Sequence, residues 1–431
     1  MAGRSTEALP TGTLLSYAEA TAVVAERARR LARTKPAIES VPLGRAAGRV
    51  LAEILRADAD QPPFARSTRD GYACRAAEIS THGALRITGT TRAGDAPAGR
   101  LAQGAAWEIM TGAPIPRGAD AVVMLEHVEP AGTAAAPGIR LVPPRAMKPG
   151  DNIVLRGAQA RKGETLLRPG TLLEAAQIAL AASCGMTRLR VYKRPRVAII
   201  STGDELTPIA ARPGPGQIRN SSSAMLAAMI AAAGGEAWSL PIARDTARSL
   251  DAALGRAESA DLLLITGGVS AGKFDLVEPA LARTGARFHF TGVRIQPGKP
   301  VVFGERPRGG TSGKEQRQRA QCFFGLPGNP VSSAVTFLLF AGPLLAALAG
   351  RNEHEPRFAL AQLSEEVRLK PGLTRFLPAA CTFAAPLPEA ARVAWQSSGD
   401  LVAMARSNCY LLVPEECAQI DAGATVRILL R

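Results

Sequence analysis

The stretch Ile265-Thr266-Gly267-Gly268-Val269-Ser270-Ala271-Gly272-Lys273-Phe274-Asp275 has the pattern of a buried strand that ends in a glycine-rich loop, with a carboxylate just inside the next helix. Two other segments have the same form: residues 201–205 (Ser-Thr-Gly-Asp-Glu) and residues 325–330 (Gly-Leu-Pro-Gly-Asn-Pro) each follow an apolar run. Three such strand ends predict a ligand crevice at the carboxyl edge of an α/β sheet. Glycines in these loops let backbone N–H groups approach an anionic ligand closely.

Strand and helix patterns alternate throughout the region around this stretch, which predicts βαβ units on a mostly parallel sheet. The apolar run 334–350 contains Pro343 and directly follows a turn, so we expect a buried helix rather than a membrane helix. The Gly/Arg/Gln-rich segment 306–321 is interpreted as a mobile surface insertion. The expected strands are 197–201, 237–242, 262–266, 287–295 and 322–325, and the expected helices are 221–233, 246–258, 275–284 and the segment from 331.

The regions on either side of this sheet have different patterns. A capping box at residues 16–19 begins a helix that extends to about Leu31. Between about residues 60 and 154, short β-like runs alternate with Pro/Gly turns and predict a small all-β domain. We expect the largely helical segment 166–189 to pack on the N-terminal helix, which makes the β domain an insertion. The chain is β-like again from residue 357.

These changes of pattern predict several domains, since a chain of 431 residues is too long for a single hydrophobic core. A prior of about 150 residues per domain agrees with this division. The predicted domains are an N-terminal helical and linker domain (1–55 with 156–192), an inserted β domain (56–155), an α/β domain (193–351) and a C-terminal β domain (352–431).

The composition favours a protein that binds small anions. The formal net charge is +15, but the arginines are scattered, aromatic residues make up only 4%, and no helix-turn-helix, RRM or zinc-finger spacing is present. We therefore expect no nucleic-acid partner, and we interpret the positive field as one that attracts phosphates and oxyanions. The 6 cysteines occur singly and only 4 histidines accompany them, so neither a zinc site nor a disulfide framework is expected. This use of cysteine, together with a polar N-terminus, favours a cytoplasmic location.

The loops that follow the strands carry the residues with candidate chemistry. The loop at 266–275 matches neither a Walker A motif nor a dinucleotide-binding fingerprint. Asp204 and Glu205 directly follow a strand. Acids in that position either hold Mg²⁺ against phosphates or cap the following backbone, and we interpret Glu205 as the functional one. Lys299 stands between two prolines, where it is either a surface charge or well placed to meet an anion.

Six motifs taken together resemble those of the molybdopterin molybdenumtransferase family, which includes MoeA and the E domain of gephyrin. They occur in the family's order and cover nearly the whole chain. The resemblance implies a multidomain α/β plus β fold: a central three-layer α/β domain of the MogA-like type with a mostly parallel sheet, an inserted small β domain, and a C-terminal β-barrel-like domain. The motifs are residues 70–73, 110–116, 201–206, 267–272, 297–300 and 326–332.

The resemblance also implies an activity, ligands and partners. In the family's reaction, the last step of molybdenum cofactor assembly, adenylylated molybdopterin and molybdate bind, AMP is hydrolysed off with the help of Mg²⁺, and molybdenum is inserted into the dithiolene. The resemblance implies a homodimer with a shared active site, in which the sheet domain of one subunit faces the β domain of the other. It further implies a transient contact with the molybdopterin adenylyltransferase, and neither a nucleic-acid nor a membrane partner.

The resemblance implies roles for individual residues from their positions in the motifs. The implied reaction needs no nucleophilic cysteine or catalytic histidine. The implied catalytic residues are Asp70, Thr111, Glu205 and Asp275, of which Glu205 and Asp275 are also the implied Mg²⁺ ligands. The implied binding residues for pterin, nucleotide and oxyanion are Thr202, Gly203, Asp245, Gly267, Gly268, Ser270, Gly272, Lys299, Pro327, Gly328, Asn329, Pro330 and Ser398.

The chain departs from the family pattern at several positions. Arg66 and Arg69 add two cations before the motif at 70–73, and the acid that usually begins this stretch is missing. Gln159 stands where the family has an acid, and Gln296 and Gly292 stand where it often has cations. The sequence leaves open whether these changes reduce activity, which residues hold Mg²⁺, and whether the oxyanion is molybdate or tungstate.

Two other functions fit parts of the sequence. A molybdopterin adenylyltransferase shares the α/β domain but does not need the inserted and C-terminal β domains. A non-catalytic molybdopterin-binding scaffold is compatible with the departures from the family pattern. Assays of turnover with molybdate, compared with simple retention of molybdopterin, separate these alternatives.

Overall fold

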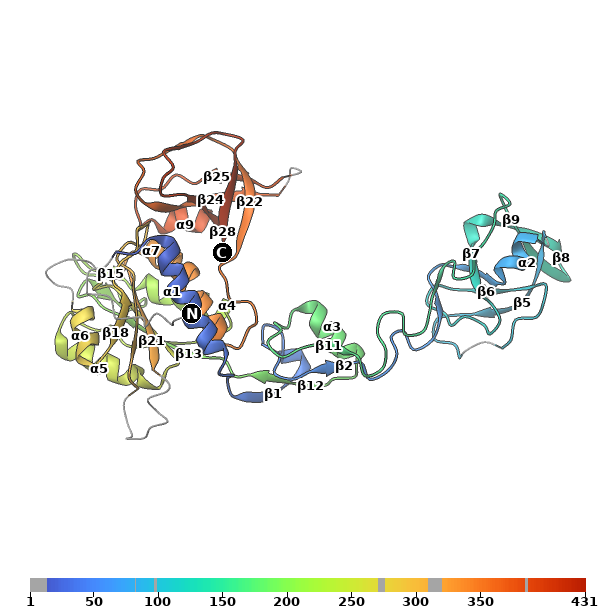
Figure 1. The fold of residues 1–431 in the computed structure, drawn as a ribbon, viewed down its shortest axis with the longest axis horizontal. Helices are drawn as coiled ribbons and strands as arrows, with labels where there is room; N and C mark the ends of the chain where they lie inside the picture. Colours follow the sequence, from blue (N-terminus) through green and yellow to red (C-terminus); the bar gives the residue numbers. More distant parts are fainter. Residues whose placement is uncertain (1–13, 82, 97–98, 270–275, 309–319, 384–386) are drawn as a thin grey trace, which may run out of the picture.

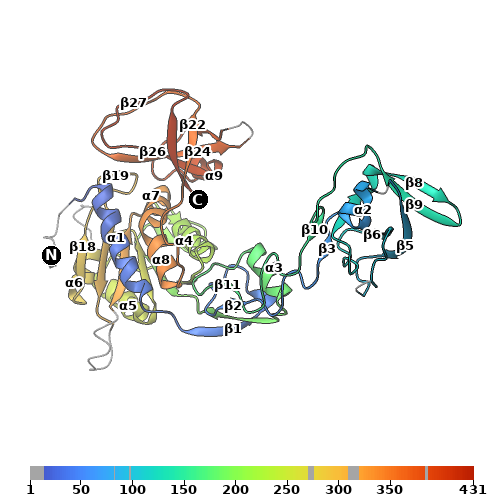
Figure 2. The ribbon, with the colours of Figure 1, turned by 45° about the vertical axis from the view of Figure 1, so that its right-hand side comes forward.

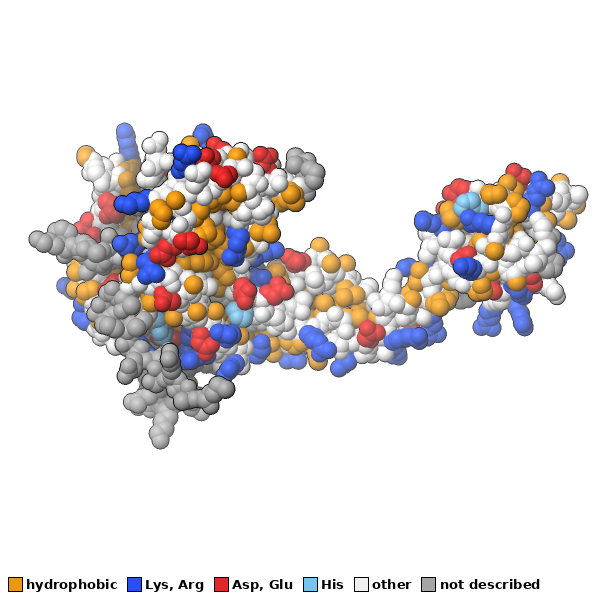
Figure 3. Space-filling model, turned by 45° about the horizontal axis from the view of Figure 1, so that its top comes forward, with side chains coloured by type: hydrophobic (Ala, Val, Ile, Leu, Met, Phe, Trp, Pro, Cys, Tyr) orange, Lys and Arg blue, Asp and Glu red, His pale blue; other side chains and the backbone are white. Residues whose placement is uncertain are grey.

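The computed structural model describes residues 14–81, 83–96, 99–269, 276–308, 320–383 and 387–431. Figures 1 and 2 show an elongated molecule, in which a central α/β sheet and a C-terminal barrel lie at one end and the inserted β domain lies at the other. A narrow arm connects the two ends. Figure 3 shows that acidic and basic side chains are interspersed over the visible surface of both ends and of the arm.

The central sheet has six strands and is mostly parallel, which confirms the predicted fold class. The first four strands in spatial order pair in parallel, and β20 is antiparallel to both of its neighbours, so that β18 runs in the same direction as the first four. The strand β20 was not predicted from the sequence, and the strand expected over 287–295 is instead β18 followed by a short strand that belongs to the barrel. The spatial order is β16 (Glu236–Ser239), β13 (Arg196–Ser201), β17 (Leu262–Thr266), β21 (Gln321–Leu326), β20 (Val302–Arg306) and β18 (Arg287–Phe290).

Helices cover both faces of this sheet and produce three layers. Along β17, Leu262 and Leu264 belong to the core on one face, whereas Leu263 and Ile265 belong to the core on the other. The first face is covered by α4 (Ser221–Ala232), α7 (Pro330–Thr336), the π-helix η5 (Phe337–Ala341) and α8 (Gly342–Leu348), and the second by α5 (Ala247–Arg256), η3 (Ala257–Ser259) and α6 (Val277–Arg283).

The helical segment Pro330–Leu348 is apolar and long enough to cross a membrane by composition alone. In the structure, 83% of its most apolar window is buried, and it packs against the first face of the sheet. The expectation of a buried core helix is therefore met by this segment.

The N-terminal helix α1 (Tyr17–Ala32) packs on α8 and η5, in the core of the sheet's first face. Its buried stripe consists of Ala20, Val24 and Ala28, small residues that let it approach α8 closely. The expectation that the segment 166–189 packs on this helix is therefore wrong. Helix α3 (Ala175–Ser183) instead contacts η1 (Leu43–Arg45), in a separate core within the arm.

Paired strands carry the chain out along the arm and back again, so the β domain is inserted between them. β1 (Ile38–Pro42) pairs with β12 (Arg188–Tyr192), β2 (Leu55–Arg56) with β11 (Thr165–Leu167), and β3 (Arg66–Ser67) with β10 (Ile153–Val154). The β domain holds a six-stranded sheet with α2 (Ala76–Thr81) and η2 (Leu125–His127) beside it. Its order is β7 (Ala121–Met124), β4 (Gly71–Cys74), β6 (Ala105–Ile109), β5 (Leu85–Thr91), β9 (Ala136–Leu141) and β8 (Val128–Thr133).

The C-terminal domain contains a closed five-stranded barrel, because β24 pairs with both β25 and β26. β19 (Ile295–Gln296) pairs with β24 and so connects the α/β domain to the barrel. The exact residue boundaries of the domains remain predictions. The barrel order is β24 (Thr374–Thr382), β25 (Glu389–Arg392), β22 (Phe358–Leu363), β28 (Thr425–Leu430) and β26 (Cys409–Val413). The C-terminal domain also contains α9 (Leu401–Arg406) and the strand pair β23 (Val367–Arg368) with β27 (Gln419–Ile420). In the α/β domain, β14 (Leu206–Thr207) pairs with β15 (Ile218–Arg219).

The segment 306–321 is not a surface insertion at its ends, which corrects the sequence interpretation. Arg306 and Gln321 are buried and pair with each other in the β20–β21 hairpin. Arg306 Nε donates a 2.6 Å hydrogen bond to Gln321 Oε1, and Gln321 Nε2 donates to the carbonyl oxygens of Ala257 and Ala260. These polar residues are buried in the sheet because backbone carbonyls at η3 accept their hydrogen bonds. A run of polar residues in the sequence does not show that such partners exist.

Candidate functional site

Three loops meet at the carboxyl edge of the sheet, after the neighbouring parallel strands β13, β17 and β21. The backbone N–H of Thr202 donates to the carbonyl oxygen of Thr266 at 3.0 Å. The Thr266 hydroxyl in turn donates to the carbonyl oxygen of Pro327 at 3.3 Å. The structure therefore brings together the residues that the three quoted segments predicted to lie near each other.

Glycines make this close approach between the loops possible. Gly267 and Gly268 have φ angles of +93° and +61°, in the region that residues with a side chain rarely adopt. A Cβ atom added at Gly267 would lie well under 3.0 Å from the carbonyl oxygen of Thr202. A Cβ atom at Gly328 would lie 3.5 Å from the Cα of Gly267, so this third loop also touches the second. Only glycine at 267 leaves both loops in place.

Two carboxylates lie at the same edge. The buried Thr202 hydroxyl donates a 2.7 Å hydrogen bond to Oδ1 of the exposed Asp245 and so fixes that carboxylate. The exposed Glu205 carboxylate folds over Gly203, since a Cβ atom there would lie 2.6 Å from its Oε1. Asp204, which the sequence left as a candidate cap, instead forms a 3.7 Å ion pair with Arg244.

The barrel contributes to the third loop. Asn329 Nδ2 donates a 2.8 Å hydrogen bond to Ser398 Oγ, and the carbonyl oxygen of Ser398 accepts from the N–H of Val331 at 3.0 Å. Pro330 begins α7, where its missing N–H needs no partner. Ser398 therefore lies next to Asn329 even though it belongs to a different domain.

A cation that the sequence analysis did not single out stands beside Gln296. Arg375 of β24 is 8% exposed, and its Nε donates a 2.9 Å hydrogen bond to Gln296 Oε1. Lys299 is exposed three residues further on, and its carbonyl oxygen accepts from the N–H of Val293. No local pattern indicated Arg375, because 79 residues separate it from Gln296.

The structure explains one of the departures from the family pattern. A Cβ atom at Gly292 would lie 2.9 Å from Leu14 Cδ1, so Leu14, three residues before the start of α1, occupies the space that a side chain would need. Gln159 is exposed in the arm, where its N–H donates to the carbonyl oxygen of Gln61 at 2.8 Å. Among the described residues, neither Gly292 nor Gln159 forms a hydrogen bond with the carboxylates of Glu205 and Asp245.

Asp70 and Thr111 form a second cluster, in the inserted β domain. The N–H of Thr111 donates to Asp70 Oδ1 at 2.7 Å, and the Thr111 hydroxyl also bonds this carboxylate. These bonds hold the pKa of Asp70 below its usual range, so the carboxylate is ionised at neutral pH. Figures 1 and 2 place this domain at the far end of the arm. A single chain therefore does not bring Asp70 and Thr111 to the sheet-edge loops.

Three of the predicted site residues lie outside the described part of the chain, namely Ser270, Gly272 and Asp275. No group of three or more His, Cys, Asp or Glu side chains suited to a metal occurs among the described residues. Glu205 and Asp245 carry carboxylate oxygens, the ligand type that Mg²⁺ prefers, and each lies in a loop at this edge.

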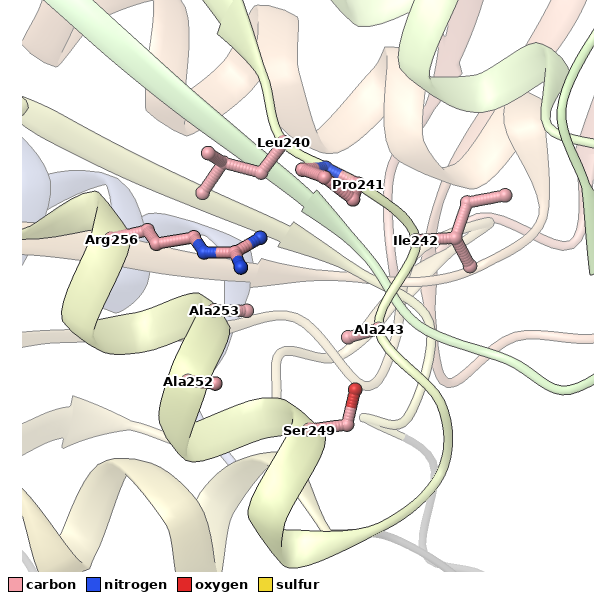
Figure 4. A pocket seen from close by; sticks show the side chains of 8 residues that line it. All are labelled: Leu240, Pro241, Ile242, Ala243, Ser249, Ala252, Ala253 and Arg256. Carbon is pink, nitrogen blue, oxygen red and sulfur yellow. The ribbon is translucent and has the colours of Figure 1, made fainter.

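Two cavities lie near this region, and neither is lined by the predicted site residues. A small one of about 130 Å³ lies between α5 and the segment that follows β16, with Ser249 and Arg256 on its wall (Figure 4). It is smaller than a usual ligand pocket. A larger one of about 880 Å³ lies between α4, the η5–α8 helix, the arm and the barrel.

Models of known families match nearly the whole chain. Residues 15–185 match the MoeA N-terminal region (domain I and II), and residues 198–347 match the probable molybdopterin binding domain. Residues 361–430 match the MoeA C-terminal region (domain IV). The three matches follow the order of the arm with its β domain, the α/β domain and the barrel.

Similar proteins share this organisation over their full length. The molybdopterin molybdenumtransferase of Nostoc sp. is 33% identical over 399 residues, which are 91% of this chain and 88% of that protein. The molybdopterin molybdenumtransferase of Haemophilus influenzae is 31% identical over 394 residues, covering 90% and 93%. The crystal structure of a molybdopterin biosynthesis MoeA protein from Pyrococcus horikoshii OT3 is 28% identical with a TM-score of 0.75, covering 97% of this chain and all of that one.

Proposed function

Because this chain belongs to the molybdopterin molybdenumtransferase family, we propose that it inserts molybdenum into molybdopterin during molybdenum cofactor biosynthesis. The chain is an enzyme that transfers molybdenum, in agreement with the name of its relatives, molybdopterin molybdenumtransferase. The observation that carries the proposal is the meeting of three glycine-containing loops at the carboxyl edge of the sheet. Such loops present backbone N–H groups to an anion, and molybdate and a pterin phosphate are both anions.

The substrates we propose are adenylylated molybdopterin and molybdate. Water attacks the phosphorus of the AMP group, and the bond from this phosphorus to the bridging oxygen breaks. The pterin phosphate leaves with the bridging oxygen, AMP keeps the oxygen of the water, and the protons of the water are released. Two Mo–S bonds then form to the dithiolene, while one oxide of molybdate takes up the two thiol protons and leaves as water. No electrons are exchanged in either step, so the reaction needs no oxidant or reductant.

The residues at the sheet edge have separate parts in this proposal. The N–H groups around Gly267 and Gly328 bind the phosphates, and Asp245, fixed by the Thr202 hydroxyl, accepts hydrogen bonds from the pterin or ribose. Lys299 and Arg375 supply positive charge on the side where Ser398 joins the loop. Glu205 positions the attacking water, since its carboxylate is exposed and held over Gly203.

Mg²⁺ is the cofactor that this chemistry calls for. When bound, it polarises the phosphoryl oxygens and stabilises the charge that develops on them. Glu205 and Asp245 are the described carboxylates that would hold it, and Asp275 remains a third candidate from its position in the sequence. The reaction is expected to take place in the cytoplasm.

A homodimer completes the site in this proposal. Asp70 and Thr111 lie at the far end of the arm from the sheet-edge loops of their own chain. A second copy, related by a two-fold axis and antiparallel along the arm, places its β domain against these loops and receives the first copy's β domain in return. A transient contact with the molybdopterin adenylyltransferase would then deliver the adenylylated substrate directly.

Molybdate-dependent release of AMP from adenylylated molybdopterin tests the proposal. We expect release by the wild type to require molybdate and Mg²⁺, and to fall at least 100-fold, about 2.7 kcal/mol of barrier, in Glu205→Gln. Glu236→Gln, which removes an exposed acid at the start of β16, is the matched control and should retain full activity. Tight retention of molybdopterin without AMP release or molybdenum insertion would refute the transferase and leave a binding protein.

A further inference from the structure

Two arginines of the β domain, Arg69 and Arg92, have no part in the function proposed above. Arg69 directly precedes Asp70, in a turn anchored by the buried side chain of Ser67. Ser67 Oγ accepts a 3.2 Å hydrogen bond from the Arg69 N–H and donates a 2.6 Å hydrogen bond to the Arg69 carbonyl oxygen. The Arg69 side chain is exposed and forms no ion pair with a carboxylate of the described residues. Its backbone is thus fixed while its charge remains available.

Arg92 reaches the same end of the β sheet from another strand. It directly follows Thr91, the last residue of β5, whose carbonyl oxygen accepts a 3.2 Å hydrogen bond from the N–H of Met110. This bond places Arg92 beside Thr111. The Arg92 N–H donates to Asp95 Oδ2 at 2.6 Å, but within the described chain its guanidinium has no carboxylate partner.

Two other arginines of this domain are neutralised by carboxylates. Arg75 pairs with Glu78 and Arg140 pairs with Glu129, both at 3.0 Å. Asp70, which follows Arg69 in the chain, is bonded by the N–H and hydroxyl of Thr111. This end of the β sheet therefore presents the carboxylates of Asp70 and Asp95, each bonded to a backbone N–H, together with two guanidinium groups that form no ion pair with a described carboxylate.

We propose that Arg69 and Arg92 bind the phosphoryl oxygens of the nucleotide-linked substrate when this end of the β domain faces the sheet-edge loops of a second copy. The inference rests on the proposed function and its shared site. The sheet edge itself presents the carboxylates of Glu205 and Asp245, which repel a diphosphate unless a cation lies between them. Arginine suits this position because its planar guanidinium donates two parallel hydrogen bonds to a phosphate.

Charge-neutralising variants of the full-length protein test the inference. We expect Arg69→Gln and Arg92→Gln each to raise the KM for adenylylated molybdopterin at least tenfold, with kcat changed less than threefold and the KM for molybdate unchanged. Arg69→Lys should recover part of the loss, because it restores the charge but not the planar fork. Arg86→Gln is the matched control, since Arg86 is exposed on β5 and pairs through its backbone with Ala105 and Gly138, toward the opposite end.

Equilibrium binding makes the result independent of turnover. Titration of pterin fluorescence should show the same tenfold weakening in Arg69→Gln, and inorganic pyrophosphate should displace the substrate less effectively from this variant than from the wild type. If the wild type binds substrate but inserts no molybdenum, the proposed function fails, and this binding comparison still decides the inference. Equal substrate affinity in Arg69→Gln, Arg92→Gln and Arg86→Gln overturns it. A selective rise in the KM for molybdate also overturns it, and would assign the arginines to the oxyanion.

Discussion

Replacing Gly267 by alanine should destabilise the α/β domain by about 2–4 kcal/mol. A residue with a side chain at a φ of +93° costs about 1–2 kcal/mol. The new Cβ also meets the carbonyl oxygen of Thr202 well inside contact distance, and this backbone atom cannot move without shifting β13. Displacing one loop from the other adds a cost of similar size. For a domain of 150–250 residues, about 2–4 kcal/mol corresponds to a fall in Tm of about 5–15 °C.

Calorimetry of the full-length protein measures this change, with activity recorded in parallel. Gly255→Ala is the control, because Gly255 lies within α5 with open space around its Cα, so alanine there should be neutral or stabilising by up to about 1 kcal/mol. The reasoning is refuted if Gly267→Ala keeps the wild-type Tm, or if Gly255→Ala loses as much stability. A lowered Tm with unchanged AMP release would show that Gly267 is needed for the stability of the fold but not for the proposed activity.

Three further outcomes are expected. Gly203→Ala should lower AMP release more than tenfold, because the atoms nearest to its Cβ belong to the carboxylate of Glu205, and it should also lower Tm, because Gly203 has a φ of +147° that residues with a side chain rarely adopt; a loss of Tm without loss of activity contradicts this. Arg306→Met should lower the free energy of unfolding by about 2–4 kcal/mol in urea titrations, because it leaves buried acceptors without a donor, and an unchanged midpoint argues against that network. Thr111→Val should raise the pKa of Asp70 toward its ordinary value, measured by NMR titration, because the hydroxyl donor is lost. Because the pKa of Asp70 is lower in the folded protein than in the unfolded chain, the ionised carboxylate stabilises the fold at pH values above the unfolded pKa, and this stabilisation is lost as the pH falls through the folded-state pKa. If the pKa of Asp70 is unchanged in Thr111→Val, the backbone N–H alone lowers it.

Short-range patterns predicted most of the α/β domain and the family. Residues 262–266 form a strand because they are a continuous apolar run, and the positive φ angles of Gly267 and Gly268 begin the loop that the glycines indicated. The helix predicted over residues 246–258 is α5, which begins after its cap Thr246 and ends at Arg256. Each of these features depends on neighbours within a few positions, which is why a single sequence is sufficient to find them.

Long-range contacts decided what the patterns could not. The polar residues Arg306 and Gln321 are buried only because η3 supplies carbonyl partners, and Arg375 reaches Gln296 from the barrel. No local signal distinguishes such residues from solvated ones, since their environment comes from distant segments. The roles of Asp70 and Thr111 remain predictions, because a single chain holds them away from the sheet edge.

The sequence by itself determined the parallel strands of the sheet and the glycine loops that follow them, because these depend on continuous apolar runs and local backbone preferences. Its six motifs, taken together, also indicated the family. Only the tertiary structure decided that α1 packs on α8 rather than on the arm, that β20 completes the sheet, and that the candidate site is divided between two ends of the molecule. The physical reason is that burial of apolar faces is not directional, so which faces meet is settled only when the whole chain packs.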